Sequence, residues 1–220
     1  MSEFVPIRMD RTQAVAVKPG DQGWLRAPQA PIERFPLERE KPESGQVTSL
    51  VRYFPDTAFP EHPHPLGEEI LVLEGVFSDA SGDYPAGSYL RNPPGSRHAP
   101  FSKDGCLIFV KLNQFAADDL QTVRVTAAQL SSQPGCQNSR CLLHEHHEAR
   151  TELIKLSAPE RYQHAAKDCE ILIIEGAVQD HNGAEFQSRS WLRYPAGQAF
   201  ELQAVDNKNS LLLVKTGGFL

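Results

Sequence analysis

Three histidines and a glutamate lie in two short segments of this 220-residue chain, at spacings that could close around one metal ion. His62 and His64 alternate along an expected strand and therefore point to the same side of it. A Pro-Leu-Gly turn then lets Glu68 face back onto them, and His98 follows a second Pro/Gly turn. Imidazole and carboxylate groups suit Zn²⁺ or Fe²⁺, with Mn²⁺ or Ni²⁺ as alternatives. We therefore expect one divalent metal ion per chain, held by these four side chains.

The elements around these residues are predicted to be strands. From residue 47 onward, short apolar runs alternate with Gly and Pro turns, which is typical of a β-sandwich or barrel. Long helical periodicity is missing, and residues 118–130 offer at most a brief helical turn. Residues 1–46 are rich in proline, so we expect them to form an extended arm with short edge strands, anchored by Trp24 and Phe35.

The β pattern occurs twice. Residues 69–75 match residues 170–176, and residues 89–95 match residues 191–197, with only one residue of slippage between the two matches. This predicts a tandem duplication, with a metal-binding repeat over 47–130 and a degenerate repeat over 131–220. The four ligands His62, His64, Glu68 and His98 are replaced in the second repeat by Gln163, Ala165, Cys169 and Phe200. Glu69 is retained as Glu170, so Glu68 is the better ligand candidate.

Composition and charge exclude some partners. The net charge of −6 and the absence of a Lys/Arg cluster argue against nucleic acid. The apolar runs are too short to cross a bilayer, so we expect no membrane association. The first residues show no positively charged segment ahead of an apolar run, so we expect no secretory signal and a cytoplasmic protein.

The four cysteines are expected to be reduced in that compartment. Cys106 and Cys169 precede apolar runs and are interpreted as small core residues. Cys136 and Cys141 could form a second metal cluster with the three histidines that follow them, His144, His146 and His147. A polar connector between the repeats is the favoured interpretation, because this spacing fits no common structural zinc motif.

These motifs resemble those of the cupin superfamily. The first cupin motif, G-x5-H-x-H-x3-E-x6-G, is matched by His62, His64, Glu68 and Gly75, with Asp56 in place of the first Gly. The second, G-x5-P-x-G-x2-H-x3-N, is matched by Gly87, Pro93, Gly95 and His98, with Ser102 in place of Asn. Both departures lie outside the metal ligands. The resemblance implies an all-β bicupin: two tandem double-stranded β-helix, or jelly-roll, barrels with the ion inside the first.

Residues 62–79 and 84–100 are similar, more narrowly, to the cupin-like domain of ChrR-type anti-sigma factors. That resemblance implies zinc bound through His62, His64, Glu68 and His98, in a response to singlet oxygen or organic peroxide. The sigma-binding part of that family is a separate helical domain with its own His/Cys zinc site. Residues 1–105 contain no cysteine and match no such domain, so sigma-factor inhibition is not carried over.

Two functions follow from this comparison. The favoured one is a metal-binding sensing or regulatory module, related to oxidative stress or to sigma factors, with a regulatory protein partner. The alternative is a non-haem metal-dependent dioxygenase that acts on a small organic substrate such as a β-diketone in the first barrel. No residue beyond the ligands identifies a reaction, so catalytic residues stay unassigned. The second repeat is expected to serve as a platform for a homodimer.

Overall fold

A computed structural model describes residues 4–28, 30–133, 136, 139–205 and 208–218. These residues form twenty-two strands and one short helix, which confirms the all-β prediction. The chain divides into two compact units. The first unit comprises Met1–Met9 and Gln22–Leu130, and the second comprises Asp10–Asp21 and Ser131–Leu220.

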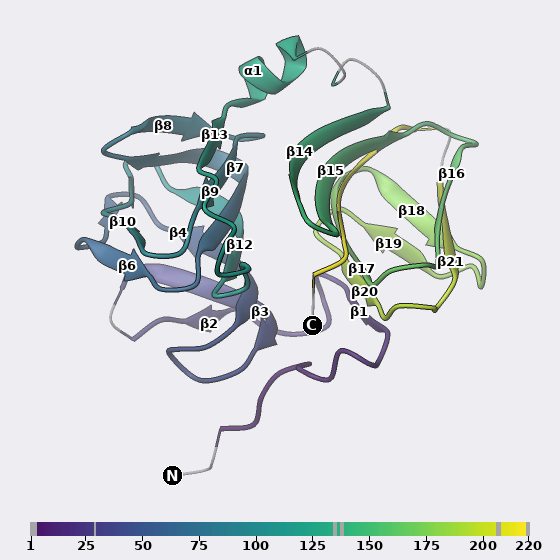
Figure 1. Cartoon of the computed structure of the whole chain (residues 1–220), viewed down its shortest axis with the longest axis horizontal. Coiled ribbons are helices and arrows are strands. Elements are labelled where there is room, and N and C mark those ends of the chain that lie inside the picture. The colour runs from purple at the N-terminus through teal and green to yellow at the C-terminus, as the bar shows by residue number, and fades with distance from the viewer. Residues whose placement is uncertain (1–3, 29, 134–135, 137–138, 206–207, 219–220) are drawn as a thin grey trace. The chain divides into compact units, whose positions relative to one another are not determined.

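The first unit is built around a ten-stranded sheet. The strands of the unit as a whole are β2 (Leu25–Arg26), β3 (Ile32–Arg39), β4 (Val47–Tyr53), β5 (Thr57–Ala58), β6 (His62–His64), β7 (Glu68–Asp79), β8 (Gly82–Pro85), β9 (Tyr89–Asn92), β10 (Ser96–His98), β11 (Phe101–Ser102), β12 (Cys106–Leu112) and β13 (Val123–Val125). The main path runs in the order β13-β9-β7-β12-β4-β3-β2, and β6 pairs with β10 in a separate two-stranded sheet (Figure 1). Inward-facing residues of these strands, including Val51, Ile70, Val72 and Ile108, form one hydrophobic core.

A tight turn at Gly67 delivers the chain from β6 to β7. Gly67 has a φ of 81°, and a Cβ atom at this position would lie 2.5 Å from the ring of Phe115. Only glycine combines this left-handed backbone with the missing side chain. The turn places Glu68 at the first position of β7, directly after the histidines of β6.

The second unit contains a six-stranded sheet and a four-stranded sheet. Its strands are β1 (Val15–Val17), β14 (Arg140–His146), β15 (Ala149–Leu156), β16 (Arg161–His164), β17 (Cys169–Glu175), β18 (Ala177–Asp180), β19 (Glu185–Gln187), β20 (Trp191–Tyr194), β21 (Phe200–Ala204) and β22 (Ser210–Thr216). The sheet orders are β1-β20-β17-β22-β15-β14 and β16-β21-β18-β19. The core of this unit includes Ile154, Ile171, Leu202 and Leu212.

The helix α1 (Ala127–Ser132) spans the end of the first unit and the start of the second. Thr126 begins it with a capping box: the Thr126 hydroxyl accepts from the Gln129 N–H, and the Gln129 side chain accepts from the Thr126 N–H. The brief helical turn expected within 118–130 is therefore present, although it extends two residues beyond that range, to Ser132.

The segment expected to be an arm contributes strands to both units. Residues 15–17 form β1 at the edge of the second unit's sheet, whereas β3 pairs with β4 inside the first unit's sheet. Phe35 is buried in β3, and the Trp24 ring packs on it with centroids 5.5 Å apart. In the described part of the chain, the single helix is much too short to cross a membrane.

Candidate metal centre

Strand pairing brings the three predicted histidines together. In the β6–β10 pair His62 lies directly opposite His98, and His64 lies two residues further along the same face of β6. The three ring centroids are 4.8–5.2 Å apart. One ring nitrogen from each histidine lies within 4.8 Å of those of the other two, which is close enough to share an ion. His64 and His98 are buried, and His62 is half-buried.

Glu68 completes the group from the start of β7. Its Oε2 atom lies 3.4 Å from Nε2 of His64 and 3.3 Å from Nε2 of His98. Ligand atoms about 2.1 Å from a tetrahedral ion are separated by roughly 3.4 Å, so these distances fit a shared ion. The neighbouring Glu69 is engaged elsewhere, because its Oε1 accepts a 2.7 Å hydrogen bond from the Tyr89 hydroxyl. The structure thus gathers the three predicted histidines and places Glu68 against two of them, His64 and His98.

The electrostatics of the group also suit a cation. Burial, together with the neighbouring His98 and His62 rings, lowers the pKa of His64 to about 3. Burial lowers the pKa of His98 as well, although its hydrogen bond to Asp79 opposes the shift. These rings are therefore neutral near pH 7 and offer lone pairs. Burial raises the pKa of Glu68 to about 7, against the effect of a hydrogen bond from Asn92.

Two buried nitrogens test whether a metal ion fits the site. Nε2 of His64 and Nε2 of His98 are inaccessible to solvent and have no hydrogen-bond partner. A buried polar atom without a partner costs free energy, and a metal ion would supply the missing interaction. The donor set therefore fits a divalent cation.

Several polar groups that the sequence did not reveal orient these ligands. Nδ1 of His98 lies 3.2 Å from an Asp79 carboxylate oxygen, and Nδ1 of His62 lies 3.0 Å from the Pro60 carbonyl oxygen. Both oxygens can only accept, so each Nδ1 carries the proton and each Nε2 keeps its lone pair. Carboxylates and carbonyls commonly fix metal-binding histidines in this way.

Glu68 has its own orienting contacts. Asn92 lies opposite it in the β7–β9 register, and Asn92 Nδ2 donates a 2.7 Å hydrogen bond to Glu68 Oε2. The Arg124 guanidinium donates to Asn92 Oδ1, which fixes the amide so that its nitrogen faces Glu68. The amide hydrogen bond favours the ionised carboxylate that a metal ion requires.

Aromatic rings line the site on the histidine side. Phe59 lies 6.2 Å from the His62 ring, and Phe77 lies 6.0 Å from the His98 ring, measured between centroids. Tyr53 packs against both phenylalanines, at 5.4 and 6.0 Å. On this side the candidate ion is therefore bordered by apolar rings, and the polar groups Asp79, Asn92 and Arg124 contact the ligands themselves or one another.

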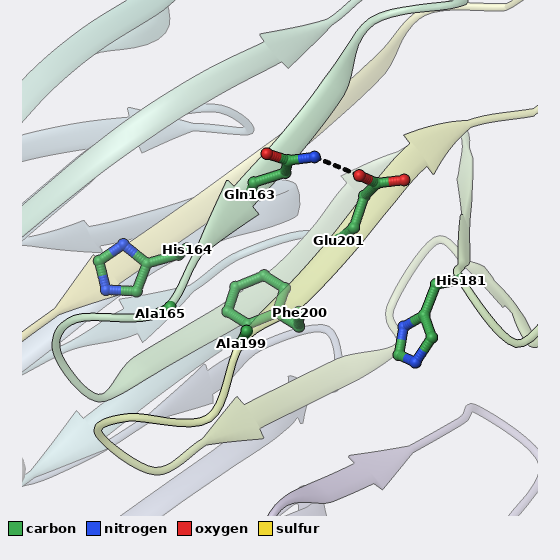
Figure 2. Close-up of a pocket in the computed structure, with 7 residues that line it drawn as sticks. All are labelled: Gln163, His164, Ala165, His181, Ala199, Phe200 and Glu201. Atoms are coloured by element: carbon green, nitrogen blue, oxygen red, sulfur yellow. Dashed lines mark hydrogen bonds between the residues drawn. The ribbon is translucent and has the colours of Figure 1, made fainter.

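In the second unit, the pairing of β16 with β21 differs by one residue from the alignment that the sequence comparison gave. In β16–β21, Phe200 lies opposite His164, and Gln163 lies opposite Glu201, whose carboxylate accepts from the Gln163 amide (Figure 2). Since His62 lies opposite His98 in the first unit, strand register would align His164 with His62, whereas the sequence comparison aligned Gln163 with it. The turn before β21 keeps its correspondence, since Gly95 donates to the His64 carbonyl and Gly197 to that of Ala165. The shift therefore arises between that turn and the strand pair.

His164 does not rebuild a ligand set in the second unit. Its Nε2 lies 3.0 Å from the Lys167 carbonyl oxygen, and Cys169, in the place of Glu68, is a fully buried free thiol. Among the described residues of this unit taken alone, no three His, Cys, Asp or Glu ligand atoms gather at metal-binding distance.

The cysteine predictions were partly correct. Cys106 and Cys169 are free and buried among core residues, as expected, and burial raises the pKa of Cys106 to about 11. The expectation of four reduced thiols was wrong, because Cys136 and Cys141 form a disulfide, with Cα atoms 4.2 Å apart. Their sulfurs are thereby unavailable as thiolate ligands, so the connector interpretation is favoured over that of a second metal cluster. His144 is buried in β14.

Comparison with known proteins agrees with this architecture. Residues 12–116 match the ChrR Cupin-like domain family. No curated protein matches the sequence. A candidate dioxygenase from Nostoc punctiforme has a similar structure, with a TM-score of 0.74 and 15% identity over 95% of this chain and 84% of its own.

The chain has a cupin fold. The bacterial pirin YhhW from Escherichia coli, solved in complex with nickel(II), is also similar, with a TM-score of 0.67 and 17% identity over 92% of this chain and 98% of its own. A mutant of the oxalate decarboxylase OxdC from Bacillus subtilis has a TM-score of 0.56 and 12% identity, over 91% of this cupin and 76% of its own chain. At these identities the likeness concerns the fold.

Proposed function

We propose that this cupin binds one divalent metal ion in its first unit, through His62, His64, Glu68 and His98. The observation that carries the proposal is the pair of buried, unpartnered Nε2 atoms of His64 and His98, which both face the Glu68 carboxylate. Zn²⁺ and Fe²⁺ suit this nitrogen and oxygen donor set best, with Mn²⁺ and Ni²⁺ as alternatives.

Elemental analysis of protein purified without added metal tests this proposal. We expect about one metal ion per chain, and less than a tenth of that in His98→Ala, because the variant loses one ligand, which is also one of the two histidines that contact Glu68. His181→Ala is a matched control, since His181 lies exposed in a turn of the second unit. An unchanged metal content in His98→Ala would show that the ligand assignment is wrong.

We further propose that the two units are duplicated cupin barrels. Two buried networks with the same register support this: Tyr89 donates to Glu69 in the first unit, and Trp191 Nε1 donates to Glu170 at 2.7 Å in the second. The second barrel, without a ligand set, would act as the platform of a homodimer. Analytical ultracentrifugation would contradict that role if the protein sediments as a monomer at micromolar concentration.

The role that we favour for the molecule is a ChrR-like sensing or regulatory module. The match of residues 12–116 to the ChrR Cupin-like domain supports it. Bound metal then braces the first barrel, and its binding energy adds to the stability of the fold. Chelation should lower the melting temperature, and an oxidant should change which partner proteins the full-length protein captures. The same set of bound partners under every redox condition would argue against this role.

A metal-dependent dioxygenase is the second candidate. The apolar surroundings formed by Phe59, Phe77 and Tyr53 favour it, because they could hold an organic substrate beside the ion. A bound ion would supply Lewis-acid and template chemistry there. Oxygen consumption by the iron-loaded protein with a β-diketone would support this candidate. Zinc-only protein that consumes no oxygen with diketones, thiols or flavonols would oppose it.

A further inference from the structure

The second unit contains a cavity of its own, separate from the histidine cluster. Its volume is about 550 Å³, within the range of about 300–1,000 Å³ that is usual for small-molecule pockets. Strands β14, β15, β16 and β22 contribute its walls, and Tyr162, a member of the hydrophobic core, lies in one of them. The cavity is large enough for one small organic molecule.

Two arginines and one glutamate provide the charge of this cavity. Arg150 and Glu152 alternate along β15 and so share a face, and Arg140 lies diagonally across on β14. The Arg150 Nε lies 3.3 Å from one Glu152 carboxylate oxygen, and Arg140 Nη1 lies 3.8 Å from the other. The Glu152 side chain is only 10% exposed, so it is held between the two guanidinium groups.

Among the side chains that line the cavity, positive charge and hydrogen-bond donors are in excess. Two arginines, Arg140 and Arg150, share the single lining carboxylate of Glu152. Glu145 also approaches Arg150, at 3.8 Å, but it is half exposed and lies outside the lining. Each guanidinium carries five N–H groups, far more than these carboxylate contacts use. A cation is disfavoured here, and an anion with a planar fork of acceptors is favoured.

An apolar wall accompanies the charged one. Leu142 lines the cavity and is 43% exposed, and the Tyr162 ring lies beneath the Arg140 guanidinium at 5.6 Å. An inorganic anion would leave this wall unused. We propose that the second unit binds a small organic carboxylate, with its carboxylate on Arg140 and Arg150 and its apolar body against Leu142 and Tyr162.

Calorimetric titration of the full-length protein with benzoate tests this site. Benzyl alcohol serves as the neutral analogue of the same shape, and inorganic phosphate serves as an anion without an apolar body. We expect saturable binding of benzoate, with affinity at least tenfold weaker for benzyl alcohol and for phosphate. Equal binding of benzoate and benzyl alcohol would overturn the proposal, and tighter binding of phosphate would make this an inorganic anion site.

Two arginine variants locate the binding. Arg140→Gln should weaken benzoate binding about tenfold or more, whereas Arg161→Gln should change it less than twofold. The pair is matched, because both side chains are ion-paired and are 56% and 55% exposed, yet Arg161 does not line this cavity. Equal effects of the two variants would overturn the proposal. Arg140→Lys provides a second test if Arg140→Gln does not fold, and it should also bind more weakly because lysine lacks the planar fork.

A variant of the first unit separates this site from the proposed metal centre. His98→Ala and chelator-treated protein should bind benzoate as the untreated protein does, because the cavity uses residues of the second unit alone. Loss of benzoate binding in either sample would place benzoate on the metal ion instead, and would overturn the proposal without affecting the metal assignment.

Discussion

Three of the four proposed ligands, His62, His98 and Glu68, are oriented by a second polar group, and this decides which of their atoms face the ion. Asp79 holds Nδ1 of His98, and Asn92 holds one oxygen of Glu68. Asp79 and Glu68 are the two ends of β7, twelve residues that would span roughly 40 Å if straight. Both carboxylates nevertheless contact the same His98 ring. The strand must therefore bend sharply, which the φ of 68° at Gly75 permits.

The metal affinity should depend on pH through Glu68. Because burial raises the pKa of Glu68 to about 7, a metal ion must displace a proton from this carboxyl below that pH. His64 is already neutral, since its pKa is lowered to about 3. The apparent association constant should therefore rise with pH up to about 7 and then level off. Competition with a chromophoric chelator at several pH values measures this association constant.

The variant Glu68→Gln is the control for this dependence. Its amide binds no proton near neutral pH, so the slope of log affinity against pH below 7 should fall by roughly one unit relative to the unaltered protein. The absolute affinity should also fall, because an amide oxygen is a poorer ligand for these cations than a carboxylate. An identical slope in both proteins would show that Glu68 is not the titrating ligand.

At the scale of elements, two turns with the same backbone conformation should respond differently to a methyl group. Gly67 and Gly95 both have φ near 80°, so alanine costs about 1–2 kcal/mol of backbone strain at either position. A Cβ on Gly67 would also collide with the Phe115 ring, whereas a Cβ on Gly95 meets nothing within 4 Å. Gly67→Ala should lower the denaturation midpoint of the first unit clearly more than Gly95→Ala. Equal midpoints for the two variants would mean that Phe115 moves aside freely.

The same elements show what the sequence could predict. The four proposed ligands were predictable because each lies within a short strand or directly after a turn, where local spacing determines direction. Asp79, Asn92 and Arg124 were not, because their positions depend on the bend in β7 and on the pairing of β9 and β13. The one-residue difference between the register of β16 and the alignment of the two sequence segments has the same origin: strand register is set by pairing, which a comparison of two sequence segments does not contain.

At the scale of the whole molecule, neither unit is a single continuous segment of the sequence. Residues 10–21 precede the first unit's sheet in sequence yet belong to the second unit. There β1 pairs with β20, and Nη2 of Arg193 donates a 2.7 Å hydrogen bond to the Asp10 carbonyl oxygen. The second unit's sheet is therefore completed by a segment that a domain boundary at residue 131 would leave out.

Two truncations should separate the roles of this N-terminal segment. Removal of residues 1–21 deletes β1 and turns β20 into a sheet edge, so the amides of Trp191–Tyr194 should exchange with solvent much faster. Removal of residues 1–9 deletes the Ile7–Arg39 bridge and the hydrogen bonds of Arg8 to Pro36, Leu37 and Gln22, all within the first unit, and should leave these amides protected. Hydrogen exchange measured by mass spectrometry on peptides covering β20 distinguishes the two. Metal content should stay the same in both truncations, because the four proposed ligands lie in the first unit beyond residue 21. Equal protection of the β20 amides in both truncations would mean that β1 does not stabilise the second unit.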